Sequence, residues 1–178
     1  MPIRFYQKLS QYTGLLLLGA IFGIVAFTAK LEVRDLDLWL HLGTGKYITE
    51  NKVIPKVDIL SCSIQGKPWV NHEWLFQVIA YGIYEKWNAE GLLMMQVFVV
   101  TVAMLFLLFI GYSSSRQLIV SVFLFMVYFI FQQRFTIRPD IFSLMFFAMY
   151  IYVLALHLDK KWSVPLLFLA QVFWVNIH

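Results

Sequence analysis

The sequence has 178 residues, of which 61% are hydrophobic, 18% aromatic and 13% charged. Soluble domains are about half apolar and a quarter charged, so this composition predicts an integral membrane protein. The net charge of +4 comes from lysines and arginines scattered between apolar runs, without the basic stripe of a nucleic-acid-binding protein, so we expect no nucleic acid partner. Cys62 is the single cysteine, which excludes an intrachain disulfide.

Apolar runs divide the chain into about five predicted transmembrane helices. About 20 apolar residues cross the ~30 Å hydrocarbon core of a bilayer, and the first two runs have this length. The last three are shorter, and helix tilt or local thinning of the bilayer would accommodate them. The predicted spans are residues 9–29, 91–112, 117–131, 141–158 and 162–178.

A long polar segment, residues 31–88, separates the first two spans. A helix is predicted over 36–50, with Asp35 or Asp37 as its N-cap. The stretch 57–71 alternates partly and contains a Gln-Gly turn, which favours a short hairpin or an extended loop.

A second helix of this segment is predicted over 71–87, with Asn71 as its cap and an apolar face. Only the 11 residues 74–84 are uncharged, too few to span, so we expect this helix to lie in the membrane interface. The sequence thus predicts an all-α integral membrane fold in three parts. These are the first span with its N-terminal segment (1–30), an extracytoplasmic loop with two interfacial helices (31–88), and a four-helix transmembrane part (89–178).

The charges of the short loops predict the orientation. Arg4 and Lys8 precede the first span, Arg116 follows the second, and Lys160 follows the fourth. The positive-inside rule then predicts a cytoplasmic N-terminus. Arg134 and Arg138 would lie outside with the long loop. The positive-inside rule does not account for them there, so we expect them to have another role.

Three polar groups fall on that same side of the membrane. Asp35, Asp37 and His41 follow the first span, His72 and Glu73 open the second loop helix, and the third group lies between the third and fourth spans. The number of intervening spans brings the three groups to one face, whichever way the protein is inserted. The third group is Arg134, Arg138 and Asp140.

Each group also has a purely structural interpretation. Asp35 and Asp37 share a face only if the chain is extended there, and otherwise one caps a helix while the other is solvated. His72 and Glu73 can simply complement a helix dipole. The arginines can extend toward lipid headgroups. The spacing leaves these alternatives open.

The motifs as a set resemble bacterial GT-C-fold membrane glycosyltransferases, which are similar to protein mannosyltransferases. The resemblance rests on "DLDLWLHLGTG", on "WVNHEWL" and on "RPD", in this order, at residues 35–45, 69–75 and 138–140. It implies a sugar donor carried on a polyprenyl phosphate at the outer leaflet and a bacterial inner-membrane location. It also implies an acceptor hydroxyl or amine outside the cytoplasm.

The resemblance implies specific roles for these side chains. Asp37, or Asp35, would be the catalytic base, while Arg138 and Arg134 would bind the substrate phosphate. The supporting residues would be His41, His72, Glu73 and Asp140. Alternatively, Asp35, Asp37 and Glu73 would hold Mg²⁺ or Mn²⁺ through oxygen ligands.

Such enzymes have around ten or more spans, so we expect this chain to correspond to their N-terminal part, with doubtful activity on its own. The alternative is a non-catalytic accessory or structural subunit that packs against other subunits of a membrane complex. We do not expect a porphyrin site at His157 or His178, because neither histidine has a small-residue pocket motif. A transporter would need more intramembrane polar residues than Gln96, Thr101, Gln171 and Asn176.

Overall fold

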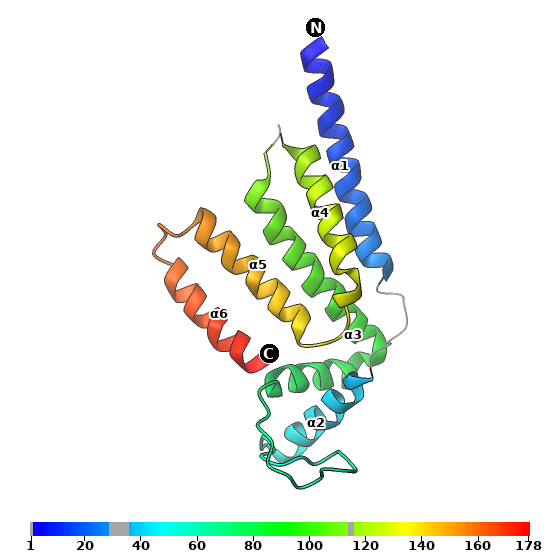
Figure 1. Cartoon of the computed structure of the whole chain (residues 1–178), viewed down its shortest axis with the longest axis vertical. Coiled ribbons are helices and arrows are strands. Elements are labelled where there is room, and N and C mark those ends of the chain that lie inside the picture. The colour runs from blue at the N-terminus through cyan, green and yellow to red at the C-terminus, as the bar shows by residue number, and fades with distance from the viewer. Residues whose placement is uncertain (1, 29–35, 114–115) are drawn as a thin grey trace.

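The computed structural model describes residues 2–28, 36–113 and 116–178, and all regular structure within these ranges is helical (Figure 1). The predicted all-α fold is therefore confirmed. The helices are α1 (Pro2–Thr28), α2 (Asp37–Asn51), α3 (Trp74–Gly111), α4 (Gln117–Phe131), α5 (Asp140–Leu156) and α6 (Ser163–Ile177), and a 3₁₀ turn, η1 (Gln132–Arg134), follows α4.

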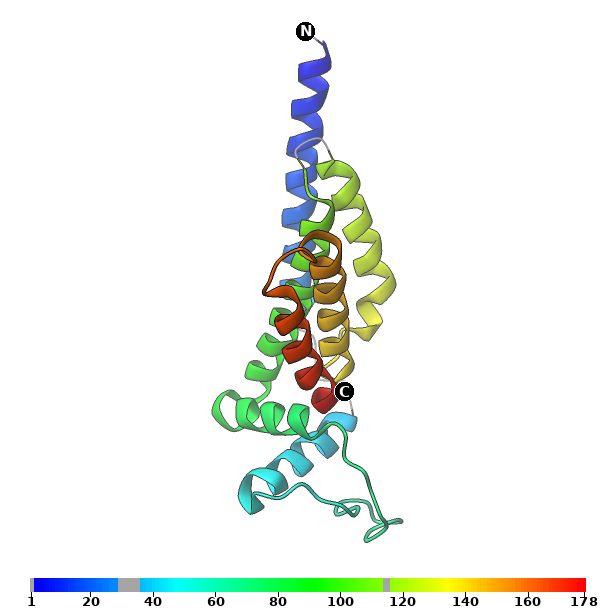
Figure 2. The same cartoon turned by 90° about the vertical axis from the view of Figure 1, so that its left-hand side faces the viewer.

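The helices form a bundle with a separate layer at one end. In the bundle, α1 and α4 run side by side in the same direction, and α5 and α6 form the next pair, with α3 between the two pairs (Figures 1 and 2). At the end away from the N-terminus, α2 and the first part of α3 lie across the ends of the other helices. We call residues 36–87, which make this layer, the outer segment.

A bend at Asn88 lets α3 belong to both layers. Asn88 has φ 50° and ψ −148°, which are not helical values, and positive φ is uncommon for a residue other than glycine. The lateral half of α3 (74–87) therefore packs on α2, while its long half (89–111) enters the bundle. The predicted interfacial helix and the predicted second span are thus two halves of one bent helix.

Two clusters of buried side chains hold the helices together. The first joins α2 to both halves of α3 and continues onto α5 and α6, through residues such as Leu38, Phe76 and Ile141. The second joins α1 and α4 to the long half of α3, through residues such as Ile21 and Leu124. Because the first cluster crosses the bend, the outer segment is packed onto the bundle and does not hang from it as a loose loop.

Two glycines allow backbones to approach closely. A Cβ atom at Gly45 of α2 would lie 2.1 Å from the Gln77 carbonyl oxygen of α3. A Cβ atom at Gly14 of α1 would lie 2.9 Å from the Gln117 Cβ of α4, and the Ser121 hydroxyl donates a hydrogen bond to the Gly14 carbonyl. Both contacts would be blocked by any larger residue.

The two predicted side-chain caps fail among the described residues. Asp37 is the first residue of α2 and not its N-cap, which is Leu36, and Asp35 lies outside the described residues. Asn71 does not cap α3, which starts three residues later at Trp74. The buried Asn71 amide instead donates to the Gln77 side chain at 2.7 Å, because that bond satisfies two groups that are both removed from water.

The stretch predicted as a hairpin or an extended loop is a turn-rich loop with one antiparallel bridge, between Val57 and Pro68. Gly66 has φ +82° at the predicted Gln-Gly turn. Asp58 accepts hydrogen bonds from the Leu60 and Ser61 amides and from the Ser61 hydroxyl. The bonds from Ser61 hold the pKa of the Asp58 carboxyl below its ordinary value.

By length and composition, the described residues contain two helices that could cross a membrane, Trp74–Gly111 and Gln117–Arg134. Three further stretches are apolar but shorter, namely Gln11–Val25, Asp140–Leu156 and Ser163–Ile177. The boundaries of α4 match the predicted third span, and α5 and α6 begin within one residue of the fourth and fifth.

Candidate functional site

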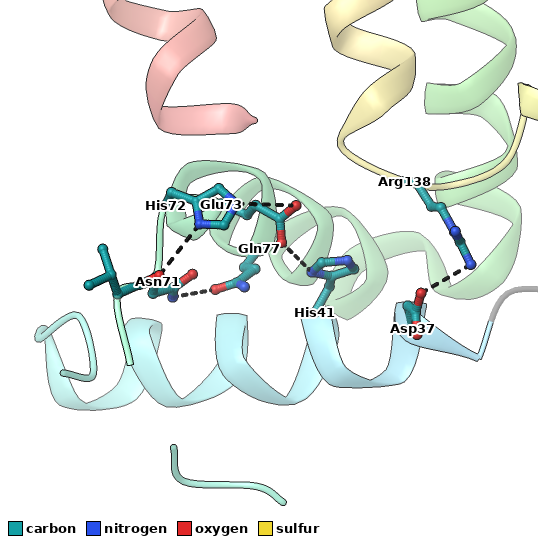
Figure 3. A network of polar contacts seen from close by, with 8 residues as sticks. Asp37, His41, Asn71, His72, Glu73, Gln77 and Arg138 are labelled. Atoms are coloured by element: carbon teal, nitrogen blue, oxygen red, sulfur yellow. Dashed lines mark hydrogen bonds and ion pairs between the residues drawn. The ribbon is translucent and has the colours of Figure 1, made fainter. Parts of the chain in front are cut away.

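The start of α2 and the turn before α5 meet through an ion pair. Arg138 Nη2 lies 3.0 Å from Asp37 Oδ2, and both side chains are about half exposed, at 46% and 61% (Figure 3). The two residues are about a hundred positions apart in the sequence. The pair therefore joins the first and the third polar groups of the sequence. Both charged groups remain accessible to solvent.

Glu73 lies between two histidines. One carboxylate oxygen is 4.0 Å from His41 Nδ1 and the other is 4.0 Å from His72 Nε2 (Figure 3). His41 is buried, with its ring edge-on to Phe76 at 5.1 Å between centroids, whereas His72 is exposed. The Glu73 carboxylate thus links a buried imidazole to an exposed one.

These two contacts lie along one side of the same helix. His41 follows Asp37 by one turn of α2, so both side chains rise toward α3 and the turn before α5 (Figure 3). We call Asp37, His41, His72, Glu73 and Arg138 the polar cluster. It contains five of the eight residues that the sequence indicates as site residues.

The other three predicted site residues have different positions. Asp35 lies outside the described residues. Arg134 is exposed at the end of η1 and forms no ion pair with the described part of the chain. Asp140 is the first residue of α5, and its Oδ1 is buried with no hydrogen-bond partner among the described residues.

The end of α6 brings to the same region polar groups that the sequence did not assign to the site. The Trp74 indole N–H donates to the Asn176 side chain at 2.8 Å. The Ser143 hydroxyl accepts from the Trp174 indole and lies 2.7 Å from His178 Nδ1. Asn176 and His178 lie at the end of a largely apolar helix, and a polar pair at such a boundary is the signal that could have found them.

Two of the three predicted metal ligands, Asp37 and Glu73, lie among the described residues. Within the described ranges, no three His, Cys, Asp or Glu side chains are grouped so that they could hold one. Asp37 is engaged with Arg138, and Glu73 lies between two imidazoles. The predicted ligand set also includes Asp35, which is outside those ranges, and we assign no step to a metal.

Comparison with protein-family models, with curated proteins and with solved structures found no match for this chain. The function is therefore argued from the polar cluster and its surroundings.

The Trp74–Asn176 bond should contribute measurably to the packing of α6 on α3. Asn176→Ala leaves the Trp74 N–H without its partner, and Trp74→Phe removes the donor. A double-mutant cycle measured by thermal unfolding in detergent should give a coupling of about 0.5–1.5 kcal/mol. The cycle of Trp74→Phe with Asn51→Ala is the control, since the Asn51 amide donates within α2, to the Tyr47 carbonyl. Equal coupling in both cycles would mean that the α3–α6 bond contributes nothing.

Proposed function

We propose that this chain is a membrane glycosyltransferase, or the N-terminal part of one, that transfers a sugar from a polyprenyl-phosphate-linked donor to an extracytoplasmic acceptor. The observation that carries the proposal is the accessible Asp37–Arg138 pair at 3.0 Å. It sets a carboxylate beside a cation at the edge of an apolar bundle. Transfer from a lipid phosphate needs both groups close together, one for the acceptor and one for the leaving group.

In the proposed reaction, the acceptor hydroxyl or amine attacks the anomeric carbon and the bond from that carbon to the phosphate oxygen breaks. The Asp37 carboxylate removes the proton of the acceptor as attack proceeds. The phosphate leaves with the bonding electrons and gains negative charge, which the Arg138 guanidinium stabilises through two N–H donors. Before attack, Arg138 exchanges part of its contact with Asp37 for the donor phosphate, which frees the carboxylate for the acceptor.

Glu73 and its two histidines would support this chemistry. The exposed His72 can pass a proton to solvent, and its Nε2 lies 4.0 Å from the Glu73 carboxylate. The buried His41 lies on the same side of α2 as Asp37, one turn away. In this proposal Glu73 and His72 carry the released proton away from the acceptor.

The proposal includes a five-span topology in the bacterial inner membrane. The first span, the long half of α3, α4, α5 and α6 would cross the bilayer, with the N-terminus in the cytoplasm and the outer segment outside. The two helices of sufficient length support membrane insertion. The shorter helices would cross with locally thinned lipid.

Labelling of single cysteines tests this orientation. Cys62 is a free and exposed thiol in the outer segment, so a membrane-impermeant maleimide should label it from outside. A Cys62→Ser, Asp159→Cys variant places the thiol in the exposed turn between α5 and α6, and it should be labelled only after the membrane is permeabilised. The opposite pattern would reverse the orientation, and labelling of both from outside would reduce the number of spans.

The activity itself is tested with the purified full chain in lipid vesicles. The donor is a radiolabelled sugar on polyprenyl phosphate, and the acceptors are a panel of hydroxyl- and amine-bearing compounds. Transfer that depends on both protein and donor supports the enzyme. Absence of transfer, together with co-purification in a defined membrane complex, supports the alternative of a non-catalytic accessory or structural subunit.

A further inference from the structure

An apolar cavity lies among α3, α4 and α5, apart from the polar cluster. Its volume is about 220 Å³, larger than the ~150 Å³ engineered cavity known to bind benzene. Its walls are aliphatic and aromatic throughout, with Val100, Met104, Val127, Phe135, Leu144 and Ala148 among them. A cavity with this lining does not hold ordered water, so a hydrocarbon group is the chemistry that fits it.

The cavity opens sideways, toward the apolar flank of the bundle. Phe131 and Phe147 line it and are nevertheless exposed, at 39% and 58%. No member of the polar cluster lines it. An occupant would therefore enter from the surface that faces lipid in the proposed topology and would not need to pass the site of sugar transfer.

A cationic residue, Arg134, is the sequence neighbour of a residue that lines the cavity. Arg134 ends η1, and the residues on either side of this turn, Phe131 and Phe135, both line the cavity. The Gln96 side chain donates to the Phe135 carbonyl, which ties this connection to α3. Arg134 is exposed, whereas Arg138 is already paired with Asp37.

We propose that this cavity holds an acyl chain of an acidic bilayer phospholipid whose phosphate is bound by Arg134. Apolar walls and the exposed Arg134, next in sequence to the lining residue Phe135, match the two parts of such a lipid. In the proposed topology bilayer phospholipids would surround the bundle at high local concentration, so mass action favours them as the occupant. The inference depends on the membrane placement proposed above, but not on glycosyl transfer. It gives Arg134 a role separate from that of Arg138.

Photolabelling of the full chain in vesicles tests the site. The vesicles consist of zwitterionic phosphatidylcholine with a small fraction of phosphatidic acid that carries a diazirine on one acyl chain, and a matched diacylglycerol probe lacks the phosphate. Labelled residues are located by mass spectrometry. The expected result is concentrated labelling of the cavity-lining residues of α3, α4 and α5 by the phosphatidic acid probe.

Two variants distinguish binding of the acyl chain in the cavity from binding of the phosphate by Arg134. Ala103→Leu fills the cavity and should abolish the concentrated labelling by both probes. Arg134→Gln should lower labelling by phosphatidic acid about tenfold and leave diacylglycerol labelling unchanged. The matched controls are Ala155→Leu, exposed on α5, and Arg116→Gln, exposed at the other end of α4. Neither control should change the labelling.

Labelling spread evenly over the exposed faces, or unaffected by Ala103→Leu, would overturn the cavity assignment. Displacement of the probe by equimolar polyprenyl phosphate but not by excess phosphatidylglycerol would overturn the assigned occupant and make the cavity part of the donor site. These outcomes are independent of sugar transfer. A protein without transferase activity would still show concentrated labelling of the cavity. A protein not embedded in the vesicles would be recognised beforehand, because it would not float with them in a flotation assay.

Discussion

Replacing Asp37 by asparagine should lower sugar transfer by about 10²–10⁴-fold, because the acceptor loses the base that removes its proton. The measurement is initial-rate transfer from the polyprenyl-phosphate-linked donor in vesicles. Asp159→Asn is the matched control, since Asp159 is also exposed and also paired with a cation, Lys160 at 3.1 Å. Transfer at the wild-type rate by Asp37→Asn would contradict the proposed role.

Asp37 also holds Arg138, so the substitution must be separated from loss of a structural contact. An exposed ion pair contributes only about 0.2–1 kcal/mol, so the melting temperature of Asp37→Asn should change little. The exchanged double variant, Asp37→Arg with Arg138→Asp, can re-form the pair while placing each group in the wrong position. If the exchanged variant regained both melting temperature and transfer, the pair would be a structural clamp and not a catalytic one.

Gly45→Ala should strongly destabilise the outer segment, although it adds only one methyl group. The new Cβ would lie 2.1 Å from the Gln77 carbonyl oxygen and 2.8 Å from Tyr81 Cβ, so α2 must move away from α3. Overpacking typically costs about 1–3 kcal/mol, and a clash with a helix backbone falls at or above the upper end. Thermal unfolding in detergent measures the loss. Transfer should fall as well, because α2 carries Asp37.

Gly82→Ala is the control for that substitution. Gly82 lies in the lateral half of α3, and a Cβ there meets no atom within 4 Å. Alanine favours a helix interior over glycine by about 1 kcal/mol, so this variant should be unchanged or slightly more stable. Equal melting temperatures for the two variants would mean that the α2–α3 contact is looser than the structure describes.

Local pattern was sufficient for much of the helical architecture. The run between Arg116 and Gln132 is almost entirely apolar, and α4 occupies it fully, because charged or amide residues bound it on both sides. The number of membrane crossings is a different matter. Length and composition support two of the described helices as spans, because the apolar stretches of α1, α5 and α6 are shorter than 18 residues.

Features that depend on tertiary contacts could not be derived in the same way. Asn71 has the residue type of a cap, but a buried amide partner on Gln77 is a stronger competitor for its side chain. The sequence separates the two halves of α3 as helices 71–87 and 91–112, but it does not give the direction of the bend at Asn88 between them.

Part of the candidate site could also be anticipated from the sequence. The predicted number of spans between them places Asp37 and Arg138 at the same end of the bundle, and the structure gives them as a pair at 3.0 Å. The contribution of α6 could not be anticipated. The sequence presents Asn176 as an intramembrane polar residue and His178 as a possible porphyrin ligand, whereas their partners Trp74 and Ser143 become apparent only in three dimensions.

The buried cluster that crosses the bend at Asn88 has a thermodynamic consequence. Phe76 and Ala80 of the lateral half share one cluster with Leu92, Met95 and residues of α5 and α6. Neither layer can lose its side-chain packing without exposing the surface of the other. The chain should therefore melt in a single cooperative transition, with the calorimetric and van't Hoff enthalpies equal, although its two layers look like separate modules.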